Sequence, residues 1–345
     1  MKNSAYFLRL LLSVSFLTLL LASCSITDDP MRGGTATLVL DVPMLKASTR
    51  ATVEGDAEEN AIYNLRVVIL SQGAESINRT FSQADLQAGT PLRIENVPVG
   101  PAQIYVIANE GSLGKDYTNL STLQNDVVPV GENKKVLIKD EDRTYFPKRR
   151  SELDKEIADD VGTKGLPMSW MDKSLTIDPP SDTPQTISVN LVRTVAKLNI
   201  LMSNALTESI TIDRMSFGEF FGNCLYLFAE QNLDVPGDTE YVSKEYTGLS
   251  IEIAGGRTVQ LVLYTYPSFA WTNPVEASPY TIGFHTQAGK DYLPQSFVNS
   301  YGALNSIARN TQVNIHAALS APANVQISFE VVPWIEKSVE VPPFN

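Results

Sequence analysis

Short runs of alternating apolar and polar residues recur along most of the chain, which predicts strands rather than helices. In "TATLVLDV" (35–42), Leu38 and Leu40 share one face, as expected for a half-buried strand. Similar runs, rich in β-branched and aromatic residues, predict further strands over 64–70, 91–97, 102–109, 134–140, 185–203, 209–217, 257–267, 280–286, 312–319, 325–334 and 338–344. The segments 81–89 and 151–162 fit short helices instead.

Many short strands separated by turn residues are typical of antiparallel β-sandwiches. The 345 residues are enough for two such domains, each with its own core. The proline-rich segment "DPPSDTPQT" (178–186) is the best candidate for a linker between them. We therefore predict an all-β protein of two antiparallel β-sandwich domains in tandem, over residues 51–182 and 183–345, with one or two short helices.

The N-terminus has the features of an export signal. Lys2 and Arg9 supply positive charge, and "LLLSVSFLTLLLA" is too short and too early for an ordinary membrane span. This run closes on "LASC", which resembles a bacterial lipobox, in which the cysteine is lipidated and becomes the new N-terminus. We expect removal of residues 1–23 and acylation of Cys24, which would anchor the protein to a membrane surface without spanning it. An ordinary secretory signal with a chance cysteine is the alternative.

Composition narrows the function further. The net charge is −12, from 27 basic and 39 acidic residues, and no basic run with interleaved aromatic residues occurs. This argues against a nucleic-acid binder. Besides Cys24 the chain has only Cys224, so an acylated Cys24 would leave no intrachain disulfide and stability would depend on the core.

Catalytic signals are weak. The two histidines, His285 and His316, stand at strand-like positions without a second metal ligand at suitable spacing. Phosphate-binding, dinucleotide-binding, serine-hydrolase and zinc-protease motifs do not occur. The acidic segments 140–143 and 158–160 lack the spacing of a calcium loop. No pair of carboxylates stands out as a candidate for glycoside hydrolysis. We expect neither enzyme activity nor a cofactor or metal.

The segment after the first predicted strand looks accessible to a protease. "ASTRATVEGD" (47–56) is small, polar and flexible, and it presents Arg50 followed by Ala51. Other basic residues, such as Lys46, lie nearby, but Arg50 stands between two strand patterns in a flexible context. The alternative is that Arg50 is an ordinary loop arginine.

The ordered segments resemble the fimbrillins of Bacteroidetes, the subunits of type V pili. The resemblance rests on the lipobox, the strand before Arg50-Ala51, "VVIL", "VIANEG" (106–111), "LPMSW" (166–170), "LVRTVAKLNI" (191–200), "IARNTQVNIHAAL" (307–319) and "FEVVPWIE" (329–336). It extends over most of the mature chain. It implies transthyretin-like, Greek-key sandwiches and a structural role at the cell surface.

The resemblance also implies a route of assembly. Family members are exported as lipoproteins to the outer-membrane surface, where an arginine-specific or trypsin-like protease removes the N-terminal segment with its first strand. A strand from another subunit can then fill the opened groove. On this chain, the resemblance implies lipid on Cys24, cleavage between Arg50 and Ala51, and loss of residues 24–50.

The strand donor would be the C-terminal segment, about 324–345. Its candidate pocket-filling residues are Val325, Ile327, Phe329, Val331, Trp334, Ile335, Val339, Val341 and Phe344. The alternative is that this segment is simply the last core strand of its own domain.

The implied partners are other fimbrial subunits, the outer membrane before processing, and the protease. Host or bacterial surface glycans or proteins are further candidates. The expected location is the outer membrane first and the fimbrium afterwards. Stalk, accessory, tip and anchor subunits share such folds, so the rank stays open, although a stalk-like or accessory subunit is favoured. A surface glycan-binding lipoprotein is the competing class.

Overall fold

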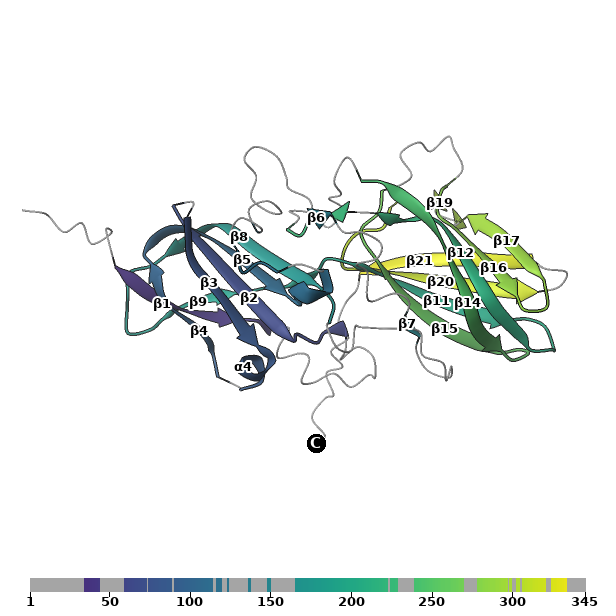
Figure 1. Ribbon diagram of the computed structural model, residues 1–345, viewed down its shortest axis with the longest axis horizontal. Coiled ribbons are helices and arrows are strands. Elements are labelled where there is room, and N and C mark those ends of the chain that lie inside the picture. The colour runs from purple at the N-terminus through teal and green to yellow at the C-terminus, as the bar shows by residue number, and fades with distance from the viewer. Residues whose placement is uncertain are drawn as a thin grey trace, which may run out of the picture.

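The chain folds into two β-sandwiches that lie end to end (Figure 1). The computed structural model describes residues 34–43, 59–72, 74–88, 90–113, 116–119, 123, 136–137, 148–149, 165–222, 224–228, 239–269, 278–296, 298–299, 302–304, 306–320 and 324–333. The prediction of an all-β protein with tandem sandwiches is confirmed.

The first sandwich packs a three-stranded sheet, β4-β1-β9, against a five-stranded sheet, β10-β8-β5-β2-β3. Leu38, Val67 and Ile104 are fully buried in its core. The strands are β1 (Thr35–Asp41), β2 (Asn64–Ser71), β3 (Ala74–Ser82), β4 (Leu92–Pro98), β5 (Gly100–Ala108), β8 (Met168–Ile177), β9 (Gln185–Ser188) and β10 (Val192–Arg193). The helix α4 (Gln83–Gln87) and the 3₁₀ helix η1 (Glu110–Leu113) accompany them.

The second sandwich packs the five-stranded sheet β21-β20-β11-β15-β7 against the four-stranded sheet β14-β12-β16-β17. Its strands are β7 (Lys148–Arg149), β11 (Ala196–Asn204), β12 (Ile210–Gly222), β14 (Tyr241–Ile253), β15 (Thr258–Thr265), β16 (Thr281–Thr286), β17 (Asp291–Ser296), β20 (Thr311–Ser320) and β21 (Asn324–Pro333). Two short ladders join β6 (Val136–Leu137) to β13 (Cys224–Leu225), and β18 (Val298–Asn299) to β19 (Gly302–Ala303).

Two pairs of strands depart from the antiparallel pattern. β1 runs parallel to β9, and β11 runs parallel to β20. Parallel neighbours require a long connection, and both pairs join strands that are far apart in the sequence. The predicted antiparallel sandwiches therefore each contain one parallel strand pair.

The run 185–203 forms three strands, β9, β10 and β11, instead of one. The chain therefore crosses from the first core to the second within this run. Ile187 and Val189 pack in the first core, whereas Ala196 begins the second core. The proline-rich segment is a connection within the first sandwich, because the Gln185 side chain bonds to both Asp178 N and Thr176 O, at 3.0 and 2.9 Å. The chain enters the second core at Ala196, later than the expected position 183.

The helix expected over 81–89 is shorter than predicted. α4 begins after Ser82, whose side chain and the Asp85 side chain form a reciprocal capping box. The apolar–polar pattern does not predict β3, β8, β14 or β17, because their outward faces are polar and their alternation is weak. The expected helix over 151–162 and strand over 338–344 lie outside the described residues.

Candidate functional site

The N-terminal strand β1 is a central strand of the first sandwich. It lies between β4, with which it pairs antiparallel, and β9, with which it pairs parallel. It is the purple strand in Figure 1. Ala36, Leu38, Leu40 and Val42 point into the core and are only 0 to 6% exposed. The alternation in the sequence therefore predicted both the strand and its buried face.

Both partners of β1 depend on it for their place in the sheet. β4 and β9 occupy opposite edges of the three-stranded sheet and have no other partner within it. Backbone bonds hold the two ends of β1, from Val99 N to Gly34 O at 3.0 Å and from Val189 N to Asp41 O at 2.8 Å. Loss of β1 would leave two unpaired strand edges on either side of an apolar groove, which is a template for another strand.

The predicted processing residues lie outside the described residues. This applies to Cys24, Arg50 and Ala51. The described chain stops at residue 43, just after β1, and resumes at Glu59, so the expected cleavage position falls between β1 and the rest of the first sandwich.

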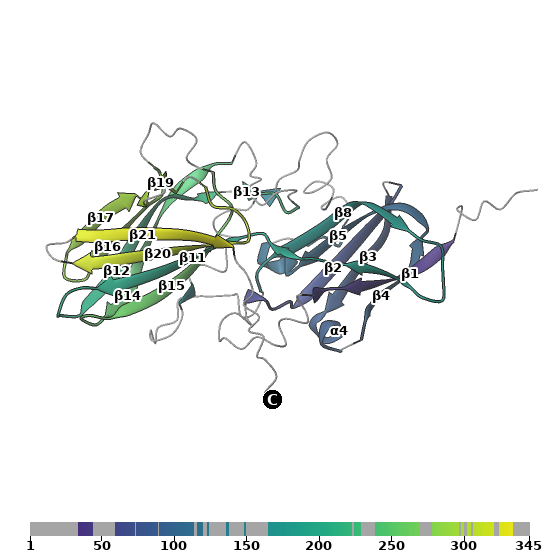
Figure 2. The same ribbon diagram turned by 180° about the vertical axis from the view of Figure 1, so that it is seen from behind.

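The predicted donor segment begins with β21, which pairs along its length with β20 at the edge of the five-stranded sheet. Figure 2 shows β21, β20, β11 and β15 side by side. Val325, Ile327 and Phe329 are half-buried against the second core, and Val331 is 45% exposed. The described chain thus holds β21 within its own domain. The remaining predicted anchors lie outside the described residues: Trp334, Ile335, Val339, Val341 and Phe344.

Asn109, within the quoted segment "VIANEG", has a structural role that the sequence did not reveal. Its φ of 58° lies in the left-handed region, which asparagine tolerates. Its amide nitrogen donates to Ala61 O at 2.9 Å and Leu166 O at 2.8 Å, and its Oδ1 accepts from Tyr63 N at 2.9 Å. One side chain therefore fixes the segment that leads into β2.

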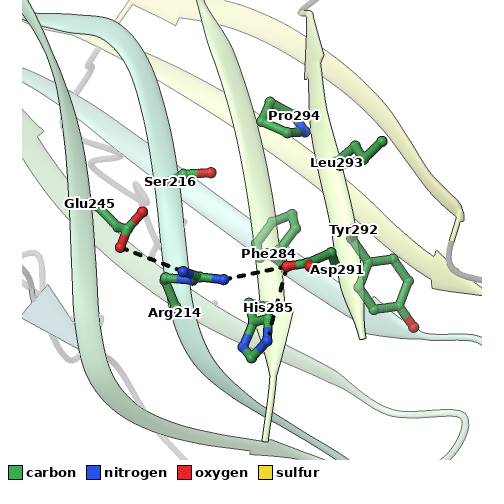
Figure 3. Close-up of a pocket in the computed structure, with 9 residues that line it drawn as sticks. All are labelled: Arg214, Ser216, Glu245, Phe284, His285, Asp291, Tyr292, Leu293 and Pro294. Atoms are coloured by element: carbon green, nitrogen blue, oxygen red, sulfur yellow. Dashed lines mark hydrogen bonds and ion pairs between the residues drawn. The ribbon is translucent and has the colours of Figure 1, made fainter. Parts of the chain in front are cut away.

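A shallow pocket of about 180 Å³ lies on the outer face of the four-stranded sheet (Figure 3). Arg214 lies between Glu245 and Asp291, at 3.8 and 3.4 Å from their carboxylate oxygens. His285 Nδ1 lies 2.6 Å from an oxygen of Asp213. These charged groups pair with one another on the outer face of the sheet.

The rest of the pocket is consistent with a structural role. Tyr292 lies beneath it with its ring buried, and burial raises the pKa of its hydroxyl. No group of three His, Cys, Asp or Glu side chains that could hold a metal ion occurs within the described ranges. Among the helices that the structure describes, none is long and apolar enough to cross a membrane.

Comparison with known protein families identifies one match. A family model described as "Fimbrillin-A associated anchor proteins Mfa1 and Mfa2" matches residues 35–340, from the first residue of β1 to beyond β21. A search of curated protein sequences found no match.

Several solved structures are similar to this chain over most of its length. The C-terminally truncated tip fimbrial protein Mfa3 from Porphyromonas gingivalis is 14% identical, with coverage of 87% of this chain and 100% of that chain and a TM-score of 0.49. A fimbrial assembly protein from Parabacteroides distasonis is 13% identical, with coverages of 87% and 95% and a TM-score of 0.47. The fimbrilin FimA from P. gingivalis W83 is 12% identical, with coverages of 87% and 97% and a TM-score of 0.45.

The family match extends over most of the chain and includes both sandwiches. Its members are structural proteins of cell-surface fimbriae that associate with other fimbrial subunits, and they are not enzymes. The chain therefore belongs to the Mfa1 and Mfa2 family of fimbrillin-associated proteins.

Proposed function

We propose that this protein is a structural subunit of a type V fimbria that polymerises by donor-strand exchange after losing β1. In this account Cys24 carries the lipid at the outer membrane, and an arginine-specific or trypsin-like protease cuts between Arg50 and Ala51. The processed subunit then joins the fimbrium and supports adhesion to host or bacterial surfaces. The observation that carries the proposal is the position of β1, a central strand that comes before the proposed cleavage position in the sequence.

The energetics of β1 support this order of events. Its three inward side chains are almost fully buried, and full burial of one large aliphatic side chain contributes about 1.5–3 kcal/mol. Uncut β1 is therefore firmly held. Once it leaves, the exposed apolar groove and the free edges of β4 and β9 favour binding of another strand. Strand donation from one subunit to the next does not close on itself, so it produces a filament.

The C-terminal segment 324–345 suits the role of donor. β21 carries apolar residues at two-residue spacing, namely Val325, Ile327, Phe329 and Val331. The same spacing occurs on β1 at Ala36, Leu38 and Leu40 and continues to Val42 just after the strand. An edge strand with a single partner is also easier to release than a central one. The two prolines near the C-terminus would limit ladder pairing of that end within its own sheet.

An anchor subunit is the second candidate, because the family description names anchor proteins. An anchor would keep both β1 and the lipid on Cys24. The two candidates therefore differ in whether the protein is cut after Arg50.

Mild trypsin treatment of the mature-length protein, followed by mass spectrometry and size-exclusion chromatography, tests the proposal. We expect one early cut after Arg50, loss of β1 and growth into oligomers. The double variant Lys46→Gln, Arg50→Gln has no trypsin site between β1 and Glu59 and should stay monomeric, whereas the control Lys46→Gln, which keeps Arg50, should behave like the wild type. A protein that resists cutting at Arg50, or that is cut and stays a monomer with β1 retained, would favour the anchor.

A further inference from the structure

Glu59 is a buried carboxylate at the junction of the two sandwiches. Its side chain is 1% exposed, and Lys197 Nζ on β11 lies 2.9 Å from Oε2. The hydroxyl of Tyr264 on β15 donates to Oε1 at 2.8 Å. Both partners belong to the second sandwich, although Glu59 leads into β2 of the first.

Arg193 ties the same segment to both sandwiches. It lies at the end of β10 and is 2% exposed. Its guanidinium donates to Asn60 Oδ1, to Glu59 O at 3.4 Å and to Asn310 Oδ1 at 3.1 Å. Asn310 lies just before β20 of the second sandwich. Arg193 therefore connects the first sandwich, the segment and the second sandwich.

Bonds from the first sandwich hold the next residues of the segment. Asn109 bonds to Ala61 and Tyr63, as described above. The segment 59–63 is thus bound at its start by side chains of both sandwiches and at its end by the first. Apolar packing continues alongside, since Val262 and Tyr264 of β15 pack with the first core.

A charge in such a place requires its partners. Removing an ion from water is costly unless an opposite charge and hydrogen bonds surround it, and removal of one partner leaves the other charge uncompensated. Glu59 and Lys197 are both almost fully buried. Separation of the sandwiches would break this pair, so the pair opposes their independent movement.

We propose that residues 59–63 form a strap that locks the two sandwiches into one cooperative unit, and that Glu59 is the residue that positions it. The strap lies C-terminal to Arg50, and none of the bonds described above involves β1. Loss of residues 1–50 should therefore leave the lock intact. Only this last point rests on the proposed function, since the locking itself is independent of cleavage.

Scanning calorimetry of the uncut mature chain tests the lock. The wild type should unfold in a single transition, because the sandwiches are coupled. Glu59→Gln should split this into two resolved transitions, and Lys197→Met should do the same. Tyr264→Phe removes the hydrogen bond to Glu59 but no charge, so it should broaden the single transition without fully splitting it. This milder variant provides a test if the charge variants fail to fold.

A matched control is available within the first sandwich. Arg66 and Glu110 form a comparable buried pair, with two bonds of 2.7 Å, but both residues lie in the same sandwich. Glu110→Gln should lower the temperature of the single transition without splitting it. If Glu59→Gln and Tyr264→Phe also only lower that temperature, or if the wild type already shows two transitions, the strap is not a lock.

Repeating the scan after trypsin treatment separates this inference from the proposed function. A wild-type product that begins at Ala51 should still unfold in one transition. Splitting in that product would overturn the claim that the lock survives processing. If trypsin never cuts after Arg50, the proposed function fails while the result for uncut Glu59→Gln stands.

Discussion

The first and last described strands, β1 and β21, differ in how firmly the fold holds them. β1 has strand partners on both sides, whereas β21 has one and lies at a sheet edge. The inward side chains of β1 are nearly inaccessible to solvent. Those of β21 are half-buried, and Val331 is 45% exposed. Both strands nevertheless carry apolar residues at two-residue spacing, three on β1 and four on β21.

This difference explains why cleavage would be needed at one end only. A central strand with a buried face does not leave spontaneously, so the uncut chain should remain a stable monomer. An edge strand with one ladder of hydrogen bonds can be released at a smaller free-energy cost. In our account, proteolysis supplies the empty groove and β21 supplies a strand of matching pattern.

The largest expected effect comes from locking β21 in place. Ala318 and Gln326 are direct cross-strand partners on the outer face of β20 and β21. Paired residues of antiparallel strands lie about 4.5–5.5 Å apart at Cα, within the range of a disulfide. Ala318→Cys with Gln326→Cys, in a Cys24→Ser, Cys224→Ser background, should abolish oligomer growth after trypsin treatment, and a reductant should restore it.

Size-exclusion chromatography with and without reductant measures oligomer growth of this variant. The reduced double variant is its own control, since only the crosslink differs. Full assembly of the oxidised protein would exclude β21 as donated strand and would limit the donor to residues 334–345.

The next largest effect concerns the core of the first sandwich. Leu38 is fully buried on β1, and Leu38→Ala should lower the free energy of unfolding by about 3 kcal/mol, as for other buried leucines. Urea unfolding of the uncut protein measures it. After trypsin removes β1, the variant and the wild type should have the same stability. A difference that persists in the cut product would show that β1 has not left.

A smaller effect is expected on β21. Ile327 is half-buried against the second core, so Ile327→Ala should lower the free energy of unfolding by about 1 kcal/mol, in proportion to its smaller buried area. The same urea experiment compares the two variants directly. If Ile327→Ala and Leu38→Ala lower the free energy of unfolding equally, β1 and β21 are held with similar strength and the proposed difference between them is wrong.

The smallest effect concerns α4, which leads into β4, the neighbour of β1. Hydrogen bonds from the Ser82 side chain and backbone lower the pKa of the Asp85 carboxyl. Because the folded pKa is lowered, the contribution of Asp85 is present above its ordinary pKa and is lost as the pH falls through the lowered value. Carbon NMR titration of Asp85 should show the lowered pKa, and Ser82→Ala should return it toward normal.

Local pattern predicted the strands but not their partners. The alternation of Leu38 and Leu40 predicts β1 and its buried face, and the alternation around Ile327 predicts β21. The parallel pairing of β1 with β9 joins residues 38–41 to 185–188, and no local pattern encodes such a contact. This pairing makes β1 central, so the property on which the proposed function depends most was not visible in the sequence.

Buried polar positions are the least apparent in the sequence. Glu59 stands at the end of an acidic stretch that is typical of solvated loops, yet it is buried because Lys197 and Tyr264 surround it. Both partners lie more than a hundred residues away in the sequence. Arg193 and Lys197 in "LVRTVAKLNI" were a sign that a buried acidic partner exists, because a strand with a buried face seldom carries arginine and lysine without partners.

The most direct test of the central claim is a crosslink that retains β1 after cleavage. Val39 and Arg93 are cross-strand partners on β1 and β4, with side chains on the outer face. In the Cys24→Ser, Cys224→Ser background, Val39→Cys with Arg93→Cys should be cut by trypsin after Arg50 and yet remain a monomer while oxidised. Addition of reductant should release β1 and start oligomer growth, measured by size-exclusion chromatography and mass spectrometry. Oligomers that form while β1 is still crosslinked, or a monomer that persists after β1 has left, would contradict the account.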